Sequence, residues 1–332
     1  MTETINRRTL LAGAAATAGA ASAAAATSAS AKGDDIDLSG VSILITGSSS
    51  GFGRLGAEHY ARLGAKVFAS MRNVPREEAT ELEELAAAEN LDITVVEIDV
   101  QSDEQVASGV ATVFEATGGK LDVLINNAGI SYGGPVEMQD MQATQDIFNT
   151  NVFGAHRMAQ AVLPAMRQQG SGHIVQITSQ LGRVIIPTLA QYSPTKFALE
   201  AMSEQMAYEV ASQGIEVTII EPGGYPTDIW ENASVLTEEL VERTSPDLLE
   251  AYSAMMEAVR ARGSNAGGDT DPMDIPRTIA EIIGMPAGSR PLRRAVHPDA
   301  KPQQFINFAS ARTQRAILNR IGYAEAGKAV LD

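Results

Sequence analysis

Short runs of β-branched and aliphatic residues alternate with longer segments of helical periodicity from residue 41 onward. Such alternation is typical of βαβ units, so it predicts a mostly parallel sheet with helices on both faces. The expected strands are Val41–Thr46, Lys66–Ser70, Ile93–Ile98, Leu121–Asn126, His173–Thr178, Glu216–Glu221 and Pro291–His297. The expected helices are Arg54–Leu63, Glu77–Asn90, Asp103–Thr117, Met141–Gln169 with a break near Thr150, Gln191–Gln213 and Asp274–Ile283. We therefore predict one doubly wound α/β domain of about seven strands over residues 32–332.

The pattern changes after Glu221, where Pro222-Gly223-Gly224 leads into a stretch rich in Met, Leu and Glu. We expect residues 225–270 to form a lid over the substrate. Its large apolar side chains can line a pocket for a hydrophobic substrate, or they can be the buried stripe of amphipathic helices. They are Tyr225, Ile229, Trp230, Leu236, Leu240, Tyr252, Met255 and Met256.

Residues 1–31 have the layout of an export signal. Arg7-Arg8 precede two leucines and a weakly apolar run of Ala, Gly, Ser and Thr, and Ala29-Ser30-Ala31 offers a cleavage site between small residues. The paired arginines resemble a twin-arginine signal, and the run is less apolar than a membrane anchor requires. We predict export to the periplasm or the medium, cleavage after Ala31 and no stable membrane insertion of the mature chain. The alternative is a low-complexity tail on a cytoplasmic protein.

Composition narrows the classes of function. The 25 Lys and Arg face 41 Asp and Glu, a net charge of −16, and no basic run is interleaved with aromatics, so nucleic acid is not expected as a partner. The absence of cysteine excludes disulfides, thiolate catalysis and cysteine-ligated zinc. The four histidines show no metal-ligand spacing. They are His59, His156, His173 and His297. We expect a small-molecule substrate and no metal.

A glycine-rich turn follows the first predicted strand and opens a helix. It reads Thr46-Gly47-Ser48-Ser49-Ser50-Gly51-Phe52-Gly53. Small residues there let backbone N–H groups and the positive end of the helix approach a pyrophosphate. Such a turn can also be an ordinary loop, but its place at the start of a βαβ series favours a dinucleotide site. The expected cofactor contacts are Gly47, Ser49, Gly51, Phe52 and Gly53.

The T-G-x-x-x-G-x-G spacing resembles the short-chain dehydrogenase/reductase family, whose members have a Rossmann fold. Asn126-Asn127-Ala128-Gly129 is similar to the N-N-A-G element of that family, and Asp99-Val100 to its adenine contact. Pro222-Gly223 with Thr227 is similar to its P-G-x-x-x-T turn. The resemblance covers roughly residues 40–300. It implies further cofactor contacts at Asp99, Val100, Asn127, Ala128, Gly129, Pro222, Gly223 and Thr227.

The end of the second predicted strand bears on the choice of cofactor. In Rossmann-type sites an acidic residue there binds the ribose of NAD, whereas an arginine accommodates the 2′-phosphate of NADP. Met71 occupies the acidic position, and Arg72 follows it. We predict NADP rather than NAD, the alternative being that Arg72 is a solvated loop charge.

Tyr192 and Lys196 are four residues apart on a predicted helix, so their side chains share one face. A nearby ammonium favours the phenolate, which predicts a lowered pKa for the tyrosine. Tyr-x-x-x-Lys alone is common, but Ser179 precedes Tyr192 by thirteen residues, as in the family. The resemblance implies that Ser179 polarises the substrate oxygen, Tyr192 transfers its proton, Lys196 holds the nicotinamide ribose, and Asn151 positions a proton-relaying water. Asn151 can equally be a helix-bending or capping residue.

Pro194 lies inside this motif, and proline is tolerated only in the first turn of a helix. The helix should therefore begin at or just before Gln191. We expect an early kink and an intact site.

The predicted function is that of an NADP-dependent oxidoreductase, which transfers a hydride between nicotinamide and a carbonyl or secondary alcohol of a small hydrophobic substrate. One alternative is a non-catalytic NADP-binding sensor, although a pure binder has no use for a tuned phenol. Another is a sugar-nucleotide epimerase or dehydratase, but these usually carry a T-G-x-x-G-x-x-G loop. The resemblance also implies a homodimer or homotetramer, paired through the long helices at residues 141–169 and 191–213.

Overall fold

A computed structural model describes residues 36–262 and 267–331. Residues 36–332 form one compact unit. The export signal predicted at residues 1–31 lies outside the described residues, so export stays a prediction. Within the described residues, no helix combines the length and the apolar character that crossing a membrane requires.

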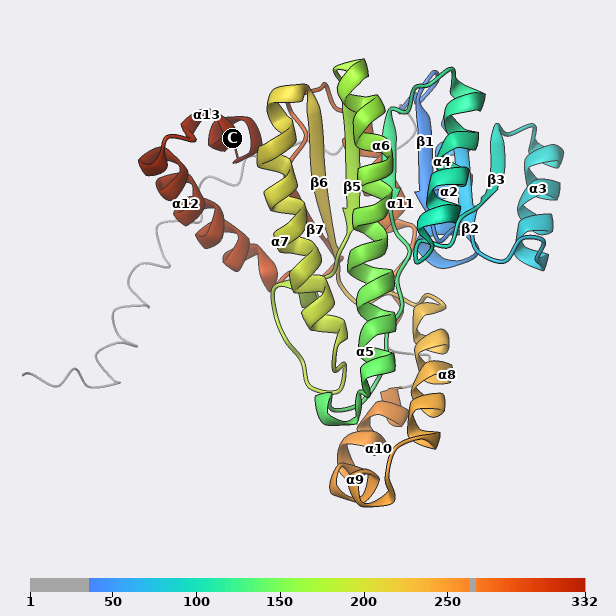
Figure 1. Cartoon of the computed structure of the whole chain (residues 1–332), viewed down its shortest axis with the longest axis vertical. Helices are drawn as coiled ribbons and strands as arrows, with labels where there is room; N and C mark the ends of the chain where they lie inside the picture. Colours follow the sequence, from blue (N-terminus) through green and yellow to red (C-terminus); the bar gives the residue numbers. More distant parts are fainter. Residues whose placement is uncertain (1–35, 263–266, 332) are drawn as a thin grey trace, which may run out of the picture. The chain divides into compact units, whose positions relative to one another are not determined.

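Seven strands form one sheet in the order β3-β2-β1-β4-β5-β6-β7 (Figure 1). Every neighbouring pair is parallel. The strands are β1 (Ser42–Thr46), β2 (Lys66–Met71), β3 (Ile93–Glu97), β4 (Val123–Asn126), β5 (Gly172–Ile177), β6 (Ile215–Pro222) and β7 (Arg293–Val296). The predicted doubly wound α/β fold is confirmed. The strand order reverses between β1 and β4, and ligands of such folds bind at the carboxyl ends of the strands around that point.

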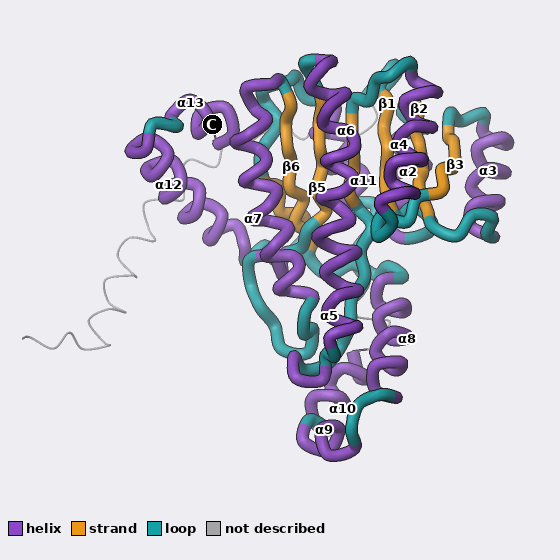
Figure 2. Tube along the Cα trace, viewed as in Figure 1, coloured by secondary structure: helices purple, strands orange, loops and turns teal. Residues whose placement is uncertain are grey.

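Helices cover both faces of the sheet, as the sequence predicted. One buried cluster contains Ile43 of β1 and Tyr60, and the other contains Leu44 of β1 and Met158. Consecutive strand residues point to opposite faces, so β1 contributes to both clusters. The first face carries α2 (Gly51–Arg62), α3 (Glu77–Glu89) and α11 (Asp274–Ile283). The second carries α4 (Asp103–Thr117), α6 (Ala155–Gln169) and α7 (Tyr192–Val210), of which α6 and α7 cross in front of the sheet in Figure 2.

The long helix predicted over residues 141–169 is interrupted near Thr150, as expected. It consists of α5 (Met141–Phe148), a π-helical turn (Asn149–Gly154) and α6. Gly154 permits a close approach here, because a Cβ at this position would lie 2.7 Å from Cγ2 of Val100. Such turns redirect side chains relative to an unbroken α-helix, and this one carries the buried Asn151.

The predicted lid contains three helices beyond the carboxyl ends of the strands (Figure 1). They are α8 (Ile229–Glu242), α9 (Pro246–Ala251) and α10 (Ser253–Arg262). The backbone N–H of Gly133 donates to Oγ1 of Thr237 over 2.8 Å, which ties α8 to the chain after β4. Leu240 and Met256 are buried, so the amphipathic-stripe interpretation is correct for these two residues.

Two C-terminal helices were not among the predicted elements. They are α12 (Gln303–Ile321) and α13 (Ala324–Leu331). Polar contacts anchor α12, since Nε2 of Gln303 donates to the Glu221 carbonyl at 3.2 Å and Nδ2 of Asn307 donates to the Glu221 carboxylate at 2.6 Å. A helix anchored by polar groups lacks the apolar periodicity from which sequence-based assignment works.

Candidate active site

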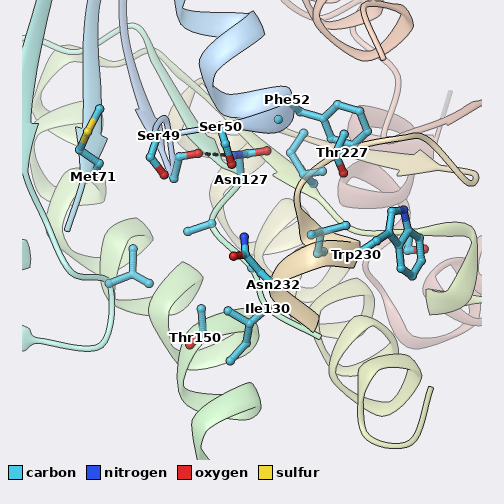
Figure 3. Close-up of a pocket in the computed structure, with 18 of the residues that line it drawn as sticks. Ser49, Ser50, Phe52, Met71, Asn127, Ile130, Thr150, Thr227, Trp230 and Asn232 are labelled. Carbon is cyan, nitrogen blue, oxygen red and sulfur yellow. Dashed lines mark hydrogen bonds between the residues drawn. The ribbon is translucent and has the colours of Figure 1, made fainter. Parts of the chain in front are cut away.

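A cleft of about 410 Å³ lies where six of the seven strands end, and segments that follow these strands form its wall (Figure 3). All but two of the site residues predicted from the sequence line this cleft. The predicted residues that line it are Gly47, Ser49, Gly51, Phe52, Arg72, Asp99, Val100, Asn127, Ala128, Gly129, Ser179, Tyr192, Lys196, Pro222, Gly223 and Thr227. Gly53 and Asn151 are not part of the lining and support it from behind.

The glycine turn after β1 leaves no room for side chains at two of its positions. Gly47 has φ +68°, and a Cβ there would lie 2.9 Å from Cα of Ala128. A Cβ on Gly53 would lie 2.1 Å from the carbonyl oxygen of Gly47, so only glycine fits this position. The first N–H groups of α2 have no acceptor within the helix, and no acidic residue occupies its first turn. An anionic group of a dinucleotide fits this helix end.

Hydrogen bonds hold this turn against the end of β4. Oγ1 of Thr46 accepts from the backbone N–H groups of Asn127 and Ala128, each at 3.0 Å. Nδ2 of Asn127 donates to the carbonyls of Thr46 and Gly47 at 2.8 and 3.1 Å. The predicted cofactor contact at Asn127 is therefore also the clamp that fixes the shape of the loop.

The end of β2 presents cationic rather than acidic side chains to the cleft. Met71 is buried, and the exposed Arg72 follows it. Arg76 also lines the cleft; it forms an ion pair with Glu78 at 2.6 Å and donates to the Arg72 carbonyl. Asp99 is the single carboxylate residue in the described lining. Sequence reasoning missed Arg76, although a second arginine four residues after Arg72 was a usable signal.

Tyr192 is the first residue of α7, so Pro194 lies in the first helical turn, where its missing N–H costs little. The prediction that the helix begins near Gln191 is confirmed. Ser179 follows β5, and its Oγ accepts from the N–H of Leu181 at 3.0 Å, which leaves the hydroxyl hydrogen available to another acceptor.

Lys196 lies on the same face of α7 as Tyr192, with Nζ 5.6 Å from the centroid of the phenol ring. Nζ donates to the carbonyl of Ile177 at 3.0 Å. Ser179, Tyr192 and Lys196 are all buried, so the fold places a hydroxyl, a phenol and an amine together at the inner wall of one cleft.

Burial raises the pKa of Tyr192 to about 12, and a hydrogen bond with Ser179 opposes this rise. Burial also lowers the pKa of Lys196 to about 8, while the charge of Glu200 opposes that fall. The sequence predicted that Lys196 lowers the pKa of Tyr192, and this is wrong for the chain by itself. The reason is that desolvation of a buried phenol outweighs an amine whose own charge is disfavoured by the same burial.

Asn151 lies in the π-helical turn and fixes the backbone after β4. Its Oδ1 accepts from the N–H of Ile130 at 2.8 Å, and its Nδ2 donates to the Ile130 carbonyl at 2.9 Å. Nδ2 also donates to Oγ1 of Thr195 at 3.1 Å. A Cβ on Gly129 would lie 3.4 Å from Oδ1 of Asn151 and 3.7 Å from Nζ of Lys196, so both groups flank this glycine. The geometry supports a structural role for Asn151 at a helix irregularity.

The predicted lid contributes an apolar wall with one amide. Ile229, Trp230 and Leu236 line the cleft, which fits the pocket interpretation for these three residues, and Nε1 of Trp230 is fixed by donating to the Tyr225 carbonyl at 2.8 Å. Figure 3 shows Asn232 and Ile130 on the lid side of the cleft, away from Ser49. Sequence reasoning missed Asn232, and its position one turn of α8 before Leu236 was the available signal.

Among the described residues, no group of three or more histidine or acidic side chains could hold a metal ion. His173 is buried in β5, with Nε2 2.9 Å from Oγ1 of Thr218. Burial lowers its pKa to about 3, so this histidine is neutral and structural.

Comparison with known proteins agrees with this geometry. The family model described as short chain dehydrogenase matches residues 42–235. Retinol dehydrogenase 8 of Bos taurus is 34% identical over 269 residues, covering 79% of this chain and 83% of the relative. A gluconate 5-dehydrogenase of Burkholderia cenocepacia, solved with NADP and tartrate, is 31% identical with a TM-score of 0.55, covering 59% of this chain and 76% of that chain.

A short chain dehydrogenase/reductase of Burkholderia phymatum, solved with NAD, shares the fold at 24% identity and a TM-score of 0.66, over 85% of this chain and 96% of that one. The family match, the relatives and the cleft agree: the chain belongs to the short-chain dehydrogenase/reductase family of oxidoreductases.

Proposed function

We propose that this enzyme is an NADP-dependent oxidoreductase that acts on a carbonyl or secondary alcohol of a small hydrophobic substrate. The proposal depends on one observation: Ser179, Tyr192 and Lys196 line the same cleft as the glycine turn. A non-catalytic sensor needs the turn but not a buried phenol and amine beside it. The glycine positions, which a Cβ would fill, fit a dinucleotide.

A nicotinamide cofactor, held by the glycine turn and Lys196, would supply or accept the hydride. Tyr192 gives its phenolic proton to the substrate oxygen during reduction and removes it during oxidation. Ser179 donates its hydroxyl hydrogen to the same oxygen and stabilises the charge that develops there. Nζ of Lys196 uses one hydrogen for the Ile177 carbonyl and has others for the phenol oxygen and a ribose hydroxyl.

Asn151 is assigned a positioning role in this proposal. Its amide holds the backbone of Ile130 and the hydroxyl of Thr195, which aligns the start of α7 with the end of β4. Oδ1 of Asn151 has a second lone pair that can accept another hydrogen bond, and Oδ1 and Nζ of Lys196 both flank Gly129. This arrangement supports a water between them that relays protons to the amine.

The preference for NADP is supported by charge at the end of β2. Arg72 and Arg76 both line the cleft there, and Met71 stands where a carboxylate would repel a phosphate. The guanidinium of Arg72 suits a 2′-phosphate, which it can bind through two N–H groups. Relatives with NAD and with NADP both exist, so they do not decide between the two cofactors.

An apolar substrate is supported by the lid side of the cleft, where Ile130, Ile229, Val235 and Leu236 form the wall. The bovine relative named retinol dehydrogenase 8 points the same way, because retinol is an apolar alcohol. Asn232 supplies one polar group for orientation within this wall.

Export and assembly are separate proposals. We propose that the segment at residues 1–31 directs export with cleavage after Ala31; N-terminal sequencing of the secreted protein tests this. We also propose pairing of subunits through α5–α6 and α7. The exposed Phe153 and Phe197 on these elements support an apolar contact there, and light scattering after size exclusion tests it.

The test of the reaction is incubation of the purified protein with NADPH or NADH and a panel of carbonyl compounds, following loss of cofactor absorbance. Tyr192→Phe should keep cofactor binding and lose at least about 100-fold in turnover, since it removes the proton donor. Tyr252→Phe is the matched control, because it removes from the lid a hydroxyl that donates a hydrogen bond to Glu137. Arg72→Asp should reverse the preference for NADPH, whereas Lys120→Asp, at an exposed lysine, should not.

Each rival function has its own outcome in this assay once a sugar nucleotide is added to the panel. Cofactor binding without reduction of any carbonyl compound, and so without oxidation of NADPH, would indicate a sensor. Conversion of a sugar nucleotide without net consumption of NADPH would indicate an epimerase. Full activity of Tyr192→Phe would contradict the assignment of the proton donor.

A further inference from the structure

The outward side of α12 exposes aromatic residues that nothing in the described part of the chain covers. Phe305 is 79% exposed and Phe308 is 66% exposed. Residues three and seven apart on a helix share one face, so Phe305, Phe308 and Arg312 point in a similar direction. Figure 1 shows α12 extending outward from the sheet, and both phenylalanine side chains are exposed.

The opposite side of α12 is anchored, so its orientation is set. Gln303 is buried and donates to the Glu221 carbonyl, and Asn307 donates to the Glu221 carboxylate. Further along the helix, the buried Leu318 packs on α13, since a Cβ on Gly327 would lie 3.3 Å from its Cδ1. The helix therefore presents the phenylalanines outward as a consequence of fixed contacts at both of its ends.

The charge of this segment is opposite to that of the rest of the chain. Residues 301–323 hold four basic residues and no Asp or Glu, in a chain of net charge −16. The four are Lys301, Arg312, Arg315 and Arg320. Arg315 donates to the carbonyl of Leu331, whereas Arg312 and Arg320 are exposed. Basic charge beside exposed phenylalanine is typical of helices that lie in the headgroup layer of a membrane.

We propose that the outward face of α12, formed by Phe305, Phe308 and Arg312, docks the protein on an anionic lipid surface. The phenyl rings enter the boundary between headgroups and acyl chains, and the guanidinium groups pair with lipid phosphates. A second copy of the chain fits this face less well, because it would bring two basic α12 segments of like charge together. The inference is independent of the reaction proposed above.

The experiment is flotation of the full chain with phosphatidylcholine vesicles that either contain or lack phosphatidylglycerol. The wild type should float with the anionic vesicles, bind neutral ones weakly, and dissociate as salt is raised. The double variant Phe305→Ser/Phe308→Ser and the variant Arg312→Glu should each bind anionic vesicles at least about tenfold more weakly. Ile185→Ser, at a side chain 72% exposed elsewhere on the surface, and Lys120→Glu are the matched controls and should bind like wild type.

All these substitutions are at exposed positions, and thermal unfolding of each variant checks that the fold is retained. Failure of the wild type to bind anionic vesicles would overturn the proposal. Binding by the α12 variants equal to wild type would also overturn it, because another segment would then hold the vesicle. A dimer that these variants abolish, without vesicle binding by the wild type, would assign the face to a second copy instead. Dehydrogenase activity on a soluble carbonyl compound should be unchanged in every variant.

Discussion

Replacing Glu221 with glutamine should stabilise the protein, and more so at pH 8 than at pH 5. Glu221 is the penultimate residue of β6 and is fully buried. One carboxylate oxygen accepts from Asn307, whereas the other has no hydrogen bond and lies 3.7 Å from Nε of Arg293. The same guanidinium bonds Glu200 at 2.9 Å and Glu204 at 2.7 Å. Three carboxylates thus share one buried cation.

Burial, followed by repulsion from Glu200, raises the pKa of Glu221 from 4.5 to about 7. Between these two values the folded state keeps a proton that the unfolded state has lost. Ionising Glu221 therefore costs stability as the pH rises through this window, with the full cost present above pH 7. At about 1.4 kcal/mol for each pKa unit, the cost is about 3 kcal/mol at pH 8 and roughly 1 kcal/mol at pH 5.

Glu221→Gln removes the charge and keeps an oxygen that can accept from Asn307. Thermal unfolding followed by circular dichroism should show a melting temperature higher than wild type by on the order of 5 °C at pH 8, and a smaller gain at pH 5. Glu115→Gln, at an exposed glutamate of α4, is the control and should change neither value.

Two results would refute this reasoning. A loss of stability in Glu221→Gln at pH 8 would mean that attraction to Arg293 outweighs desolvation and repulsion from Glu200. An equal gain at both pH values would mean that the benefit comes from packing or hydrogen bonding, and not from removal of a buried charge.

Two further substitutions test the cofactor loop and the helix capping. Gly47→Ala should weaken NADPH binding at least about tenfold, because φ is +68° and the new Cβ would press on Ala128, and a fluorescence titration with unchanged affinity would contradict this. Ser102→Ala removes the oxygen that accepts from the N–H of Gln105 at 3.2 Å, so it should cost about 1 kcal/mol of stability in a thermal melt and leave turnover intact. No change in the melt would mean that water replaces the cap.

Several parts of this structure could be predicted because their causes are local. The helix after β3 begins and ends at the predicted residues, Asp103 and Thr117, since Ser102 caps its first turn and Gly118 terminates it in a left-handed conformation. The side chain of Gln105 accepts from the N–H of Asp99 and so joins this helix to the end of the preceding loop. The glycine turn could be located for a similar reason, as its spacing is a backbone requirement visible in the residues themselves.

The sequence by itself therefore determined the strand and helix order, the phosphate-binding turn, and the sharing of one helix face by Tyr192 and Lys196. Only the tertiary structure decided which groups are buried together, because burial depends on contacts between segments far apart in the chain. For this reason the pKa of Tyr192 lies above its ordinary value. For the same reason α12, anchored by polar contacts to Glu221, could not be recognised from an apolar period.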